Sequence, residues 1–184
     1  MPKIGEVQRG GRESLDVPGL PWLQDVLRGG LTKVKQLMNT ISQLKDVDVT
    51  NLSYTINCFL PRREHYAEEL DLPLAIALLS SYLQQQVPAN GLFAGELDLT
   101  SRIRRPDSNY LAELAQILVR VHSGTVQRVY LSSEANQEMC QHLAEQEKAA
   151  QSEGAGGAVN IEVMGVRDLA ALLNLLWPDL GVAA

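Results

Sequence analysis

Hydrophobic and polar positions alternate with two different periods along this chain. From residue 31 to residue 44 apolar side chains recur every three or four positions, which predicts an amphipathic helix with Thr32 as its N-cap. Between residues 52 and 60 the period is two, which predicts a strand with one buried face. The first third of the chain is therefore expected to hold a helix followed by a strand.

The centre of the chain predicts a more deeply buried helix. From residue 72 to residue 83 apolar side chains point in nearly every direction of a helix, with Asp71 as the expected cap and Pro73 tolerated in the first turn. Residues 92–99 and 102–104 then predict two short strands joined by a turn.

The remainder of the chain alternates between helices and strands. Ser108 opens a second amphipathic helix, and Gly124 follows as its expected stop. The further expected elements are a strand at 126–131, a polar helix at 134–148, a flexible loop at 151–158, a strand at 159–163 and a helix at 167–176. Strands that alternate with helices predict an α/β (α+β) fold with packed layers.

Composition adds limits on size and location. Hydrophobic residues make up 45% of the 184 residues, enough for one compact domain. The net charge of -6 provides no general attraction to nucleic acid, although a local basic patch could. Two widely separated cysteines, Cys58 and Cys140, and the lack of a long apolar run favour a reducing, cytoplasmic location without membrane contact.

Five short segments stand in an order that is typical of one protein family. They are the strand at 54–59, Asp-Leu-Pro-Leu-Ala at 71–75, Phe-Ala-Gly-Glu-Leu-Asp-Leu-Thr at 93–100, Val-Tyr-Leu at 129–131 and Val-Met-Gly-Val-Arg-Asp-Leu at 163–169. Together they resemble the Lon-protease-like domain, in particular the copies in the bacterial recombination ATPase RadA and the chelatase-like protein ComM. The helix start looks closest to ComM and the last segment closest to RadA.

The resemblance spans residues 31–178 and implies a mixed sheet with packed helices, the ribosomal-protein domain-2-like fold. Residues 1–30 would then be a flexible arm or lead-in, and residues 179–184 a tail. In such proteins the domain adjoins a nucleotide-driven motor, which this sequence lacks. Whether the chain is a whole protein or a fragment of a longer ATPase stays open at this point.

The catalytic pair of the family is missing. A Lon-type protease uses a serine hydroxyl activated by a neutral lysine. The resemblance places the nucleophile position at Glu69 and the lysine position at Ala112 or Glu113, and no lysine occurs between Lys45 and Lys148. A pseudo-protease is therefore expected, not an active enzyme.

Other residues suggest chemistry less strongly. His65 with Glu68 or Glu69 could form a general acid/base pair, although acidic residues also simply suit the first turn of a helix. Ser80 and Ser81 are expected to serve helix packing.

Neither a metal site nor a cofactor is expected. Cys140 and His142 lack the further ligands that zinc needs, so ordinary helix packing is the expected role of Cys140. The glycines at 154, 156 and 157 are not followed by the Lys-Ser or Lys-Thr pair of a phosphate-binding loop.

Arginines form the main candidate binding site. If the sheet brings their segments together, five guanidinium groups could grip phosphates; otherwise they form a solvated rim paired with Glu68, Glu69 or Asp107. The five are Arg62, Arg63, Arg102, Arg104 and Arg105.

The leading functional hypothesis is a noncatalytic scaffold. The resemblance implies a role in DNA recombination, repair or transformation, with the domain assembling with its own copies or with a partner ATPase into a ring around nucleic acid. Trp22 and Trp177 are possible aromatic anchors, or parts of the core. The alternatives are a divergent hydrolase or transferase that uses His65, and a partner-binding regulatory subunit with no connection to nucleic acid.

Overall fold

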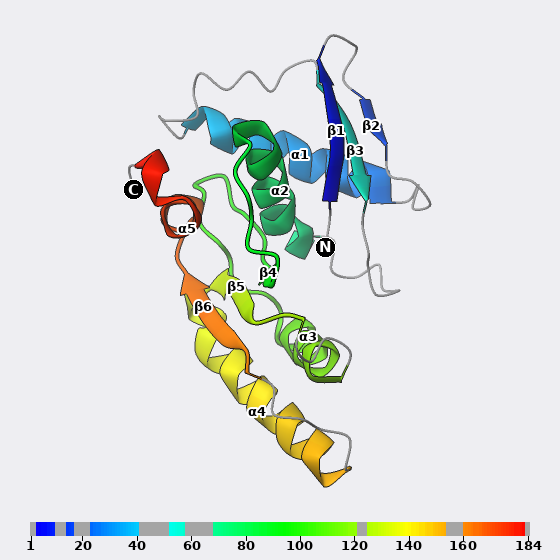
Figure 1. Ribbon diagram of the computed structural model, residues 1–184, viewed down its shortest axis with the longest axis vertical. Coiled ribbons are helices and arrows are strands. Elements are labelled where there is room, and N and C mark those ends of the chain that lie inside the picture. The colour runs from blue at the N-terminus through cyan, green and yellow to red at the C-terminus, as the bar shows by residue number, and fades with distance from the viewer. Residues whose placement is uncertain are drawn as a thin grey trace.

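The computed structural model describes residues 3–9, 14–16, 23–40, 52–57, 68–120, 125–153 and 160–182. Within these ranges helices and strands alternate along much of the chain, so the expectation of α/β structure is confirmed (Figure 1). The helices are α1 (Leu23–Thr40), α2 (Asp71–Leu83), α3 (Ser108–Arg120), α4 (Asn136–Ser152) and α5 (Leu169–Leu176). None of the described helices combines the length and the apolar character needed to cross a membrane.

The described residues form two separate three-stranded sheets. In the first, the central strand β3 (Leu52–Asn57) pairs antiparallel with β1 (Lys3–Arg9) and parallel with β2 (Ser14–Asp16). In the second, β4 (Gly91–Phe93), β5 (Arg128–Ser132) and β6 (Glu162–Val166) run parallel in that order. Parallel neighbours need crossover connections, and α3 and α4 lie in these connections.

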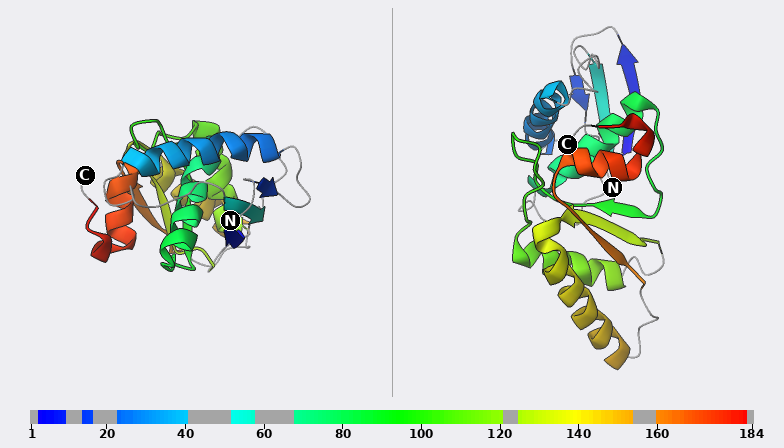
Figure 2. Two further views of the ribbon diagram at one scale, coloured as in Figure 1. Left: turned by 90° about the horizontal axis from the view of Figure 1, so that it is seen from above. Right: turned by 90° about the vertical axis from the view of Figure 1, so that its left-hand side faces the viewer.

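The parallel sheet divides the hydrophobic core into two. Side chains of successive strand residues point to opposite faces, so Tyr130 of β5 joins one core while Val129 and Leu131 join the other. Helices α1, α2 and α5 fill the first core, and α3 and α4 fill the second. Figure 2 (right) shows the strands between α5 on one side and α3 and α4 on the other.

Several predicted elements agree with the structure. Helix α3 begins at Ser108 as predicted, and its stripe of Leu111, Leu114, Ala115 and Leu118 is buried. Helix α2 ends at Leu83 as predicted. Helix α4 continues to Ser152, beyond the predicted end at residue 148, and β6 starts later than predicted, at Glu162.

The N-terminal prediction is wrong in its local structure. Residues 3–9 and 14–16 are strands instead of a flexible arm, and α1 begins at Leu23, well before residue 31. Thr32 consequently lies inside the helix, where its hydroxyl donates to the carbonyl oxygen of Arg28 at 2.9 Å and caps nothing. The predicted continuation of this helix to residue 44 and of β3 to residue 60, and the stop at Gly124, lie outside the described residues.

The first of the two strands expected at residues 92–99 and 102–104 is present only at its start, as part of β4, and the residues around the turn at 100–101 form single bridges. Leu97 bridges Ile103, and Arg102 bridges Asp168, both antiparallel. Ser101 has a φ of 65°, and the backbone N–H of Leu169 donates to its carbonyl oxygen at 2.8 Å. The segment between β4 and α3 therefore folds as a tight loop that is attached to the start of α5.

Candidate functional site

The position that the resemblance assigns to the nucleophile lies on a short turn before α2. Glu69 belongs to the 3₁₀ turn Glu68–Leu70, and its carbonyl oxygen accepts from the N–H of Gly95 at 3.2 Å. The N–H of Leu72 in turn donates to the carbonyl oxygen of Gly95 at 3.0 Å. These two bonds fasten the start of α2 to the segment that follows β4.

The positions assigned to the lysine are on another element. Ala112 and Glu113 are half-buried on α3, which packs with α4 in the second core, whereas α2 packs in the first. Neither the methyl group of Ala112 nor the carboxylate of Glu113 supplies an amine, and Glu69 supplies no hydroxyl. The three positions therefore lack the chemistry of a Ser-Lys pair.

A charged cluster that was not predicted from the sequence lies at the start of α2. The Nζ atom of Lys33, on α1, is 2.6 Å from Oδ2 of Asp71 and 3.4 Å from Oε1 of Glu96. The N–H of Leu97 donates to the same Asp71 oxygen at 3.3 Å. The Lys33–Asp71–Glu96 cluster thus joins α1, α2 and the loop after β4. Asp71, expected as a helix cap, makes no cap hydrogen bond, and Leu70 occupies the N-cap position.

Burial and charge act in opposite directions in this cluster. Burial raises the pKa of Asp71, whose side chain is 8% exposed, and Lys33 offsets only part of that rise. Burial alone would lower the pKa of Lys33, but the two carboxylates outweigh it and raise the pKa above that of a free lysine. The amine is therefore held protonated at neutral pH and is unsuited to be a general base.

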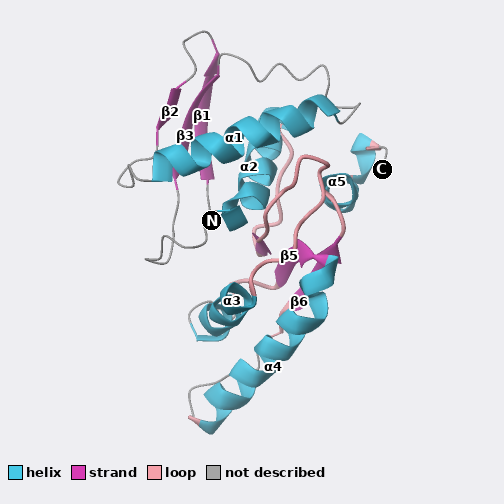
Figure 3. Ribbon diagram, turned by 180° about the vertical axis from the view of Figure 1, so that it is seen from behind, coloured by secondary structure: helices cyan, strands magenta, loops and turns pink. Residues whose placement is uncertain are grey.

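The predicted arginine site is divided by the structure. Arg102 and Arg104 are exposed on either side of the buried Ile103, and Nη1 of Arg104 lies 3.9 Å from Oε2 of Glu96. Arg105 is directed instead toward α4, where it pairs with Glu138. Figure 3 shows the loop that carries these residues, between β4 and α3, on the side of the sheet that faces α2 and α5.

An arginine that was not among the predicted site residues joins this surface. The N–H of Ile103 donates to the carbonyl oxygen of Arg167 at 3.1 Å, and the backbone bridge between Arg102 and Asp168 adjoins it. The side chain of Arg167 is 69% exposed, and its Nε lies 2.7 Å from Asp168. We call Arg102, Arg104 and Arg167 the arginine edge. These three residues come together because two segments that are distant in the sequence pair with each other.

Two of the predicted arginines have partners outside the set that the rim interpretation assigned. Arg104 lies 3.9 Å from Glu96 and Arg105 pairs with Glu138, whereas that interpretation assigned Glu68, Glu69 and Asp107. Asp107 accepts the N–H of Asn109 at 2.8 Å, at the start of α3. Arg62, Arg63 and His65 lie outside the described residues, as does the side chain of Glu68, so the hydrolase hypothesis stays a prediction.

The loop beside the arginine edge is rigidly hydrogen-bonded. Oδ1 of Asp98 accepts from the N–H and the hydroxyl of Thr100 at 2.8 and 2.7 Å, and from the N–H of Arg102 at 3.0 Å. Burial would raise the pKa of Asp98, but these hydrogen bonds outweigh it and lower the pKa. The turn holds Leu99 at its tip, where this residue is 67% exposed.

Two of the remaining candidates, Ser80 and Trp177, make structural hydrogen bonds. Ser80 donates its hydroxyl to the carbonyl oxygen of Gln85 at 2.6 Å and so closes the end of α2, while Ser81 is exposed. Cys140 is also exposed, because it lies on the side of α4 that faces away from the second core. Its predicted packing role is therefore wrong. Trp177 is 5% exposed and donates to a backbone carbonyl, as a core residue does.

No metal site is visible in the part of the chain that the structure describes. His142 contacts Glu138 at 3.8 Å and Glu145 at 3.6 Å, but no group of three or more His, Cys, Asp or Glu residues is arranged to hold an ion there. Trp22, the other suggested anchor, and the glycines at 154, 156 and 157 lie outside the described residues.

Comparison of the chain with models of known protein families and with curated proteins found no match.

Proposed function

We propose that this chain is a noncatalytic Lon-protease-like module that acts as a scaffold in the cytoplasm. In this proposal it assembles with copies of itself or with a partner ATPase, and it serves DNA recombination, repair or transformation, as the resemblance to the domains of RadA and ComM suggests. The order of the five sequence segments supports the family assignment.

The observation that carries the proposal is the state of the amine at the start of α2. A serine nucleophile needs a neighbouring neutral amine to take its proton. Lys33, the amine that contacts this end of α2, is engaged by Asp71 and Glu96, and both carboxylates favour its charged form. This arrangement supports a structural use of the region, in which charge fastens three elements together.

Two measurements on the purified chain test the proposal. We expect light scattering to show a defined oligomer at micromolar concentration and an assay with a fluorescent unfolded protein to show no hydrolysis. A persistent monomer that also fails to bind a partner ATPase would contradict the scaffold. Hydrolysis that is lost in Ser80→Ala or Ser81→Ala would contradict the noncatalytic assignment. In that case Lys33→Met would show whether the Lys33 amine takes part in the hydrolysis.

A further inference from the structure

Helix α5 presents an apolar stripe on the outside of the protein. Leu175 is 47% exposed, and Ala171, one turn before it on the same face of the helix, is partly exposed. Further apolar side chains with some exposure follow closely in the sequence: Leu176, Pro178 and Leu180. Figure 1 shows α5 on the side of the molecule away from α3 and the N-terminal strands. An exposed leucine with apolar neighbours on a surface helix is typical of a protein contact.

The N-terminal end of α5 carries positive charge. Nε of Arg167 lies 2.7 Å from Oδ2 of Asp168, and Oδ1 of Asp168 accepts from the N–H of Ala171 at 2.8 Å. These contacts place the guanidinium group of Arg167 beside the Ala171 end of the stripe. The exposed Arg102 adjoins it through the backbone bridge to Asp168. Because the side chain of Asp168 is 12% exposed and that of Arg167 is 69% exposed, the outward charge at this end is positive.

The C-terminal end of α5 carries negative charge. Asp179 is the only charged side chain from residue 169 to residue 184, and it is exposed on the short turn Pro178–Leu180 that follows the helix. It makes no ion pair with any residue that the structure describes. The dipole of α5 has the same direction, positive at the N-terminus of the helix and negative at its C-terminus. The apolar stripe therefore lies between a basic end and an acidic end.

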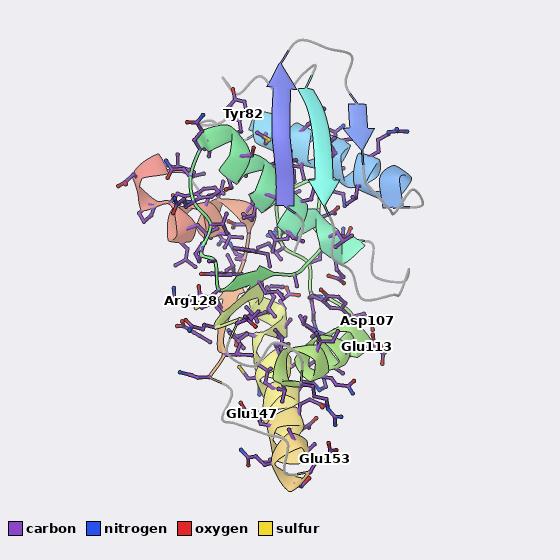
Figure 4. The ribbon with its side chains drawn as sticks, turned by 45° about the vertical axis from the view of Figure 1, so that its right-hand side comes forward. Tyr82, Asp107, Glu113, Arg128, Glu147 and Glu153 are labelled. Carbon is purple, nitrogen blue, oxygen red and sulfur yellow. The ribbon has the colours of Figure 1, made fainter. Side chains whose placement is uncertain are left out.

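Acidic groups of α4 do not neutralise this basic end. Glu147 and Glu153 lie at the distal end of α4, far from α5 (Figure 4). Glu138, at the other end of that helix, is paired with Arg105. Arg167 uses its Nε–H on Asp168, which leaves the Nη donors of the guanidinium group for a further carboxylate. A carboxylate from a second molecule can therefore bind there without breaking the contact with Asp168.

We propose that the α5 helices of two copies of this chain pack antiparallel across a twofold axis. This inference rests on the proposed function, and it identifies the surface through which copies assemble. The antiparallel direction pairs Arg167 of each copy with Asp179 of the other, whereas a parallel pair would bring like charges together. A twofold axis midway between Ala171 and Leu175 also places each leucine on the small alanine of the second copy. Such a contact uses the same surface on both copies and closes as a dimer.

Charge reversal with a mixing step tests the contact. Arg167→Asp and Asp179→Lys should each raise the Kd of self-association roughly tenfold or more, as measured by light scattering over a concentration series. Each variant alone places like charges at both ends of the contact. An equimolar mixture of the two variants should associate again, because both ends of the mixed dimer then hold opposite charges. The variant that carries both substitutions should recover self-association for the same reason.

The two exposed leucines provide a matched comparison. Leu175→Ser should weaken self-association, because it removes the centre of the apolar stripe. Leu99→Ser changes the more exposed of the two leucines, on the loop between β4 and α3, and should leave self-association unchanged. An effect of Leu99→Ser as large as that of Leu175→Ser would contradict the location of the contact.

The outcomes separate this inference from the proposed function. A wild-type chain that stays monomeric and binds no partner ATPase would overturn both. Self-association that Arg167→Asp and Asp179→Lys leave intact, or that their mixture fails to restore, would overturn the inference alone. A monomeric wild type whose binding to a partner ATPase is lost in Leu175→Ser would overturn it as well, and would assign this face of α5 to that partner.

Discussion

Replacement of Lys33 by methionine would leave a carboxylate stranded inside the protein. The side chain of Asp71 is 8% exposed, and with Lys33 removed it would keep the hydrogen bond from the N–H of Leu97, at 3.3 Å. Methionine retains much of the apolar stem of lysine, so the substitution removes charge more than packing. The cost therefore reports mainly on the buried charge of Asp71.

The size of the effect follows from how each partner is buried. Removing one member of a buried ion pair costs about 3–5 kcal/mol, and we expect Lys33→Met to lie near the lower limit because the Leu97 hydrogen bond remains. Asp71→Asn should cost less, about 1–2 kcal/mol, because the lysine is 25% exposed and can turn toward Glu96 and water. The double variant should cost less than the sum of the two.

The pH dependence has a definite sign. Burial raises the pKa of Asp71 in the folded protein above its ordinary value, so the folded state binds this proton more tightly than the unfolded state. Lys33 lowers this pKa, so the removal of Lys33 raises the pKa of Asp71 further. The penalty of Lys33→Met should therefore be largest at neutral pH and should shrink as the pH falls through the folded pKa toward about 4.

Urea unfolding followed by circular dichroism, at pH 7.5 and at pH 5, measures these quantities. The expected result is a free energy of unfolding that is lower for Lys33→Met than for Asp71→Asn at pH 7.5, with a smaller difference at pH 5. Equal costs for the two single variants, or a cost of Lys33→Met that does not change with pH, would refute the reasoning from burial.

Two further predictions concern backbone positions near the site. Gly30→Ala would place a Cβ atom 2.8 Å from Oδ1 of Asp71 and should lower the melting temperature. Gly29→Ala, whose Cβ atom would meet nothing within 4 Å, should instead stabilise α1 by about 1 kcal/mol. If thermal unfolding ranks the two variants the other way, the packing around Gly30 is not as described. Asp98→Ala should accelerate amide hydrogen exchange at Thr100. In the wild type, hydrogen bonds to the charged Asp98 carboxylate lower its pKa, so protonation of this carboxylate weakens them. Exchange at Thr100, corrected for intrinsic rates, should therefore become faster as the pH falls through the pKa of Asp98. Protection that stays constant over this range would contradict the hydrogen-bonded turn.

Local patterns in the sequence were enough to predict much of the secondary structure. The apolar stripe of α3 predicted that helix, and apolar residues on all sides predicted the buried helix α2. Both predictions work because the side chains on a face determine whether that face is buried. The N-terminal strands were missed because β1 depends on pairing with β3, which begins more than forty residues later. A strand of this kind is stabilised by its partner more than by its own pattern.

Three features can be read from the residues alone: the α/β alternation, the helix faces and the lack of a lysine between Lys45 and Lys148. The places where charged side chains meet depend on the packing of the folded chain. Lys33 and Asp71 are 38 positions apart, and Arg167 reaches the arginine edge through a backbone bridge between distant loops. Periodicity reports which side of an element is buried, whereas an ion pair depends on which elements meet, and that is set by the packing of the whole core.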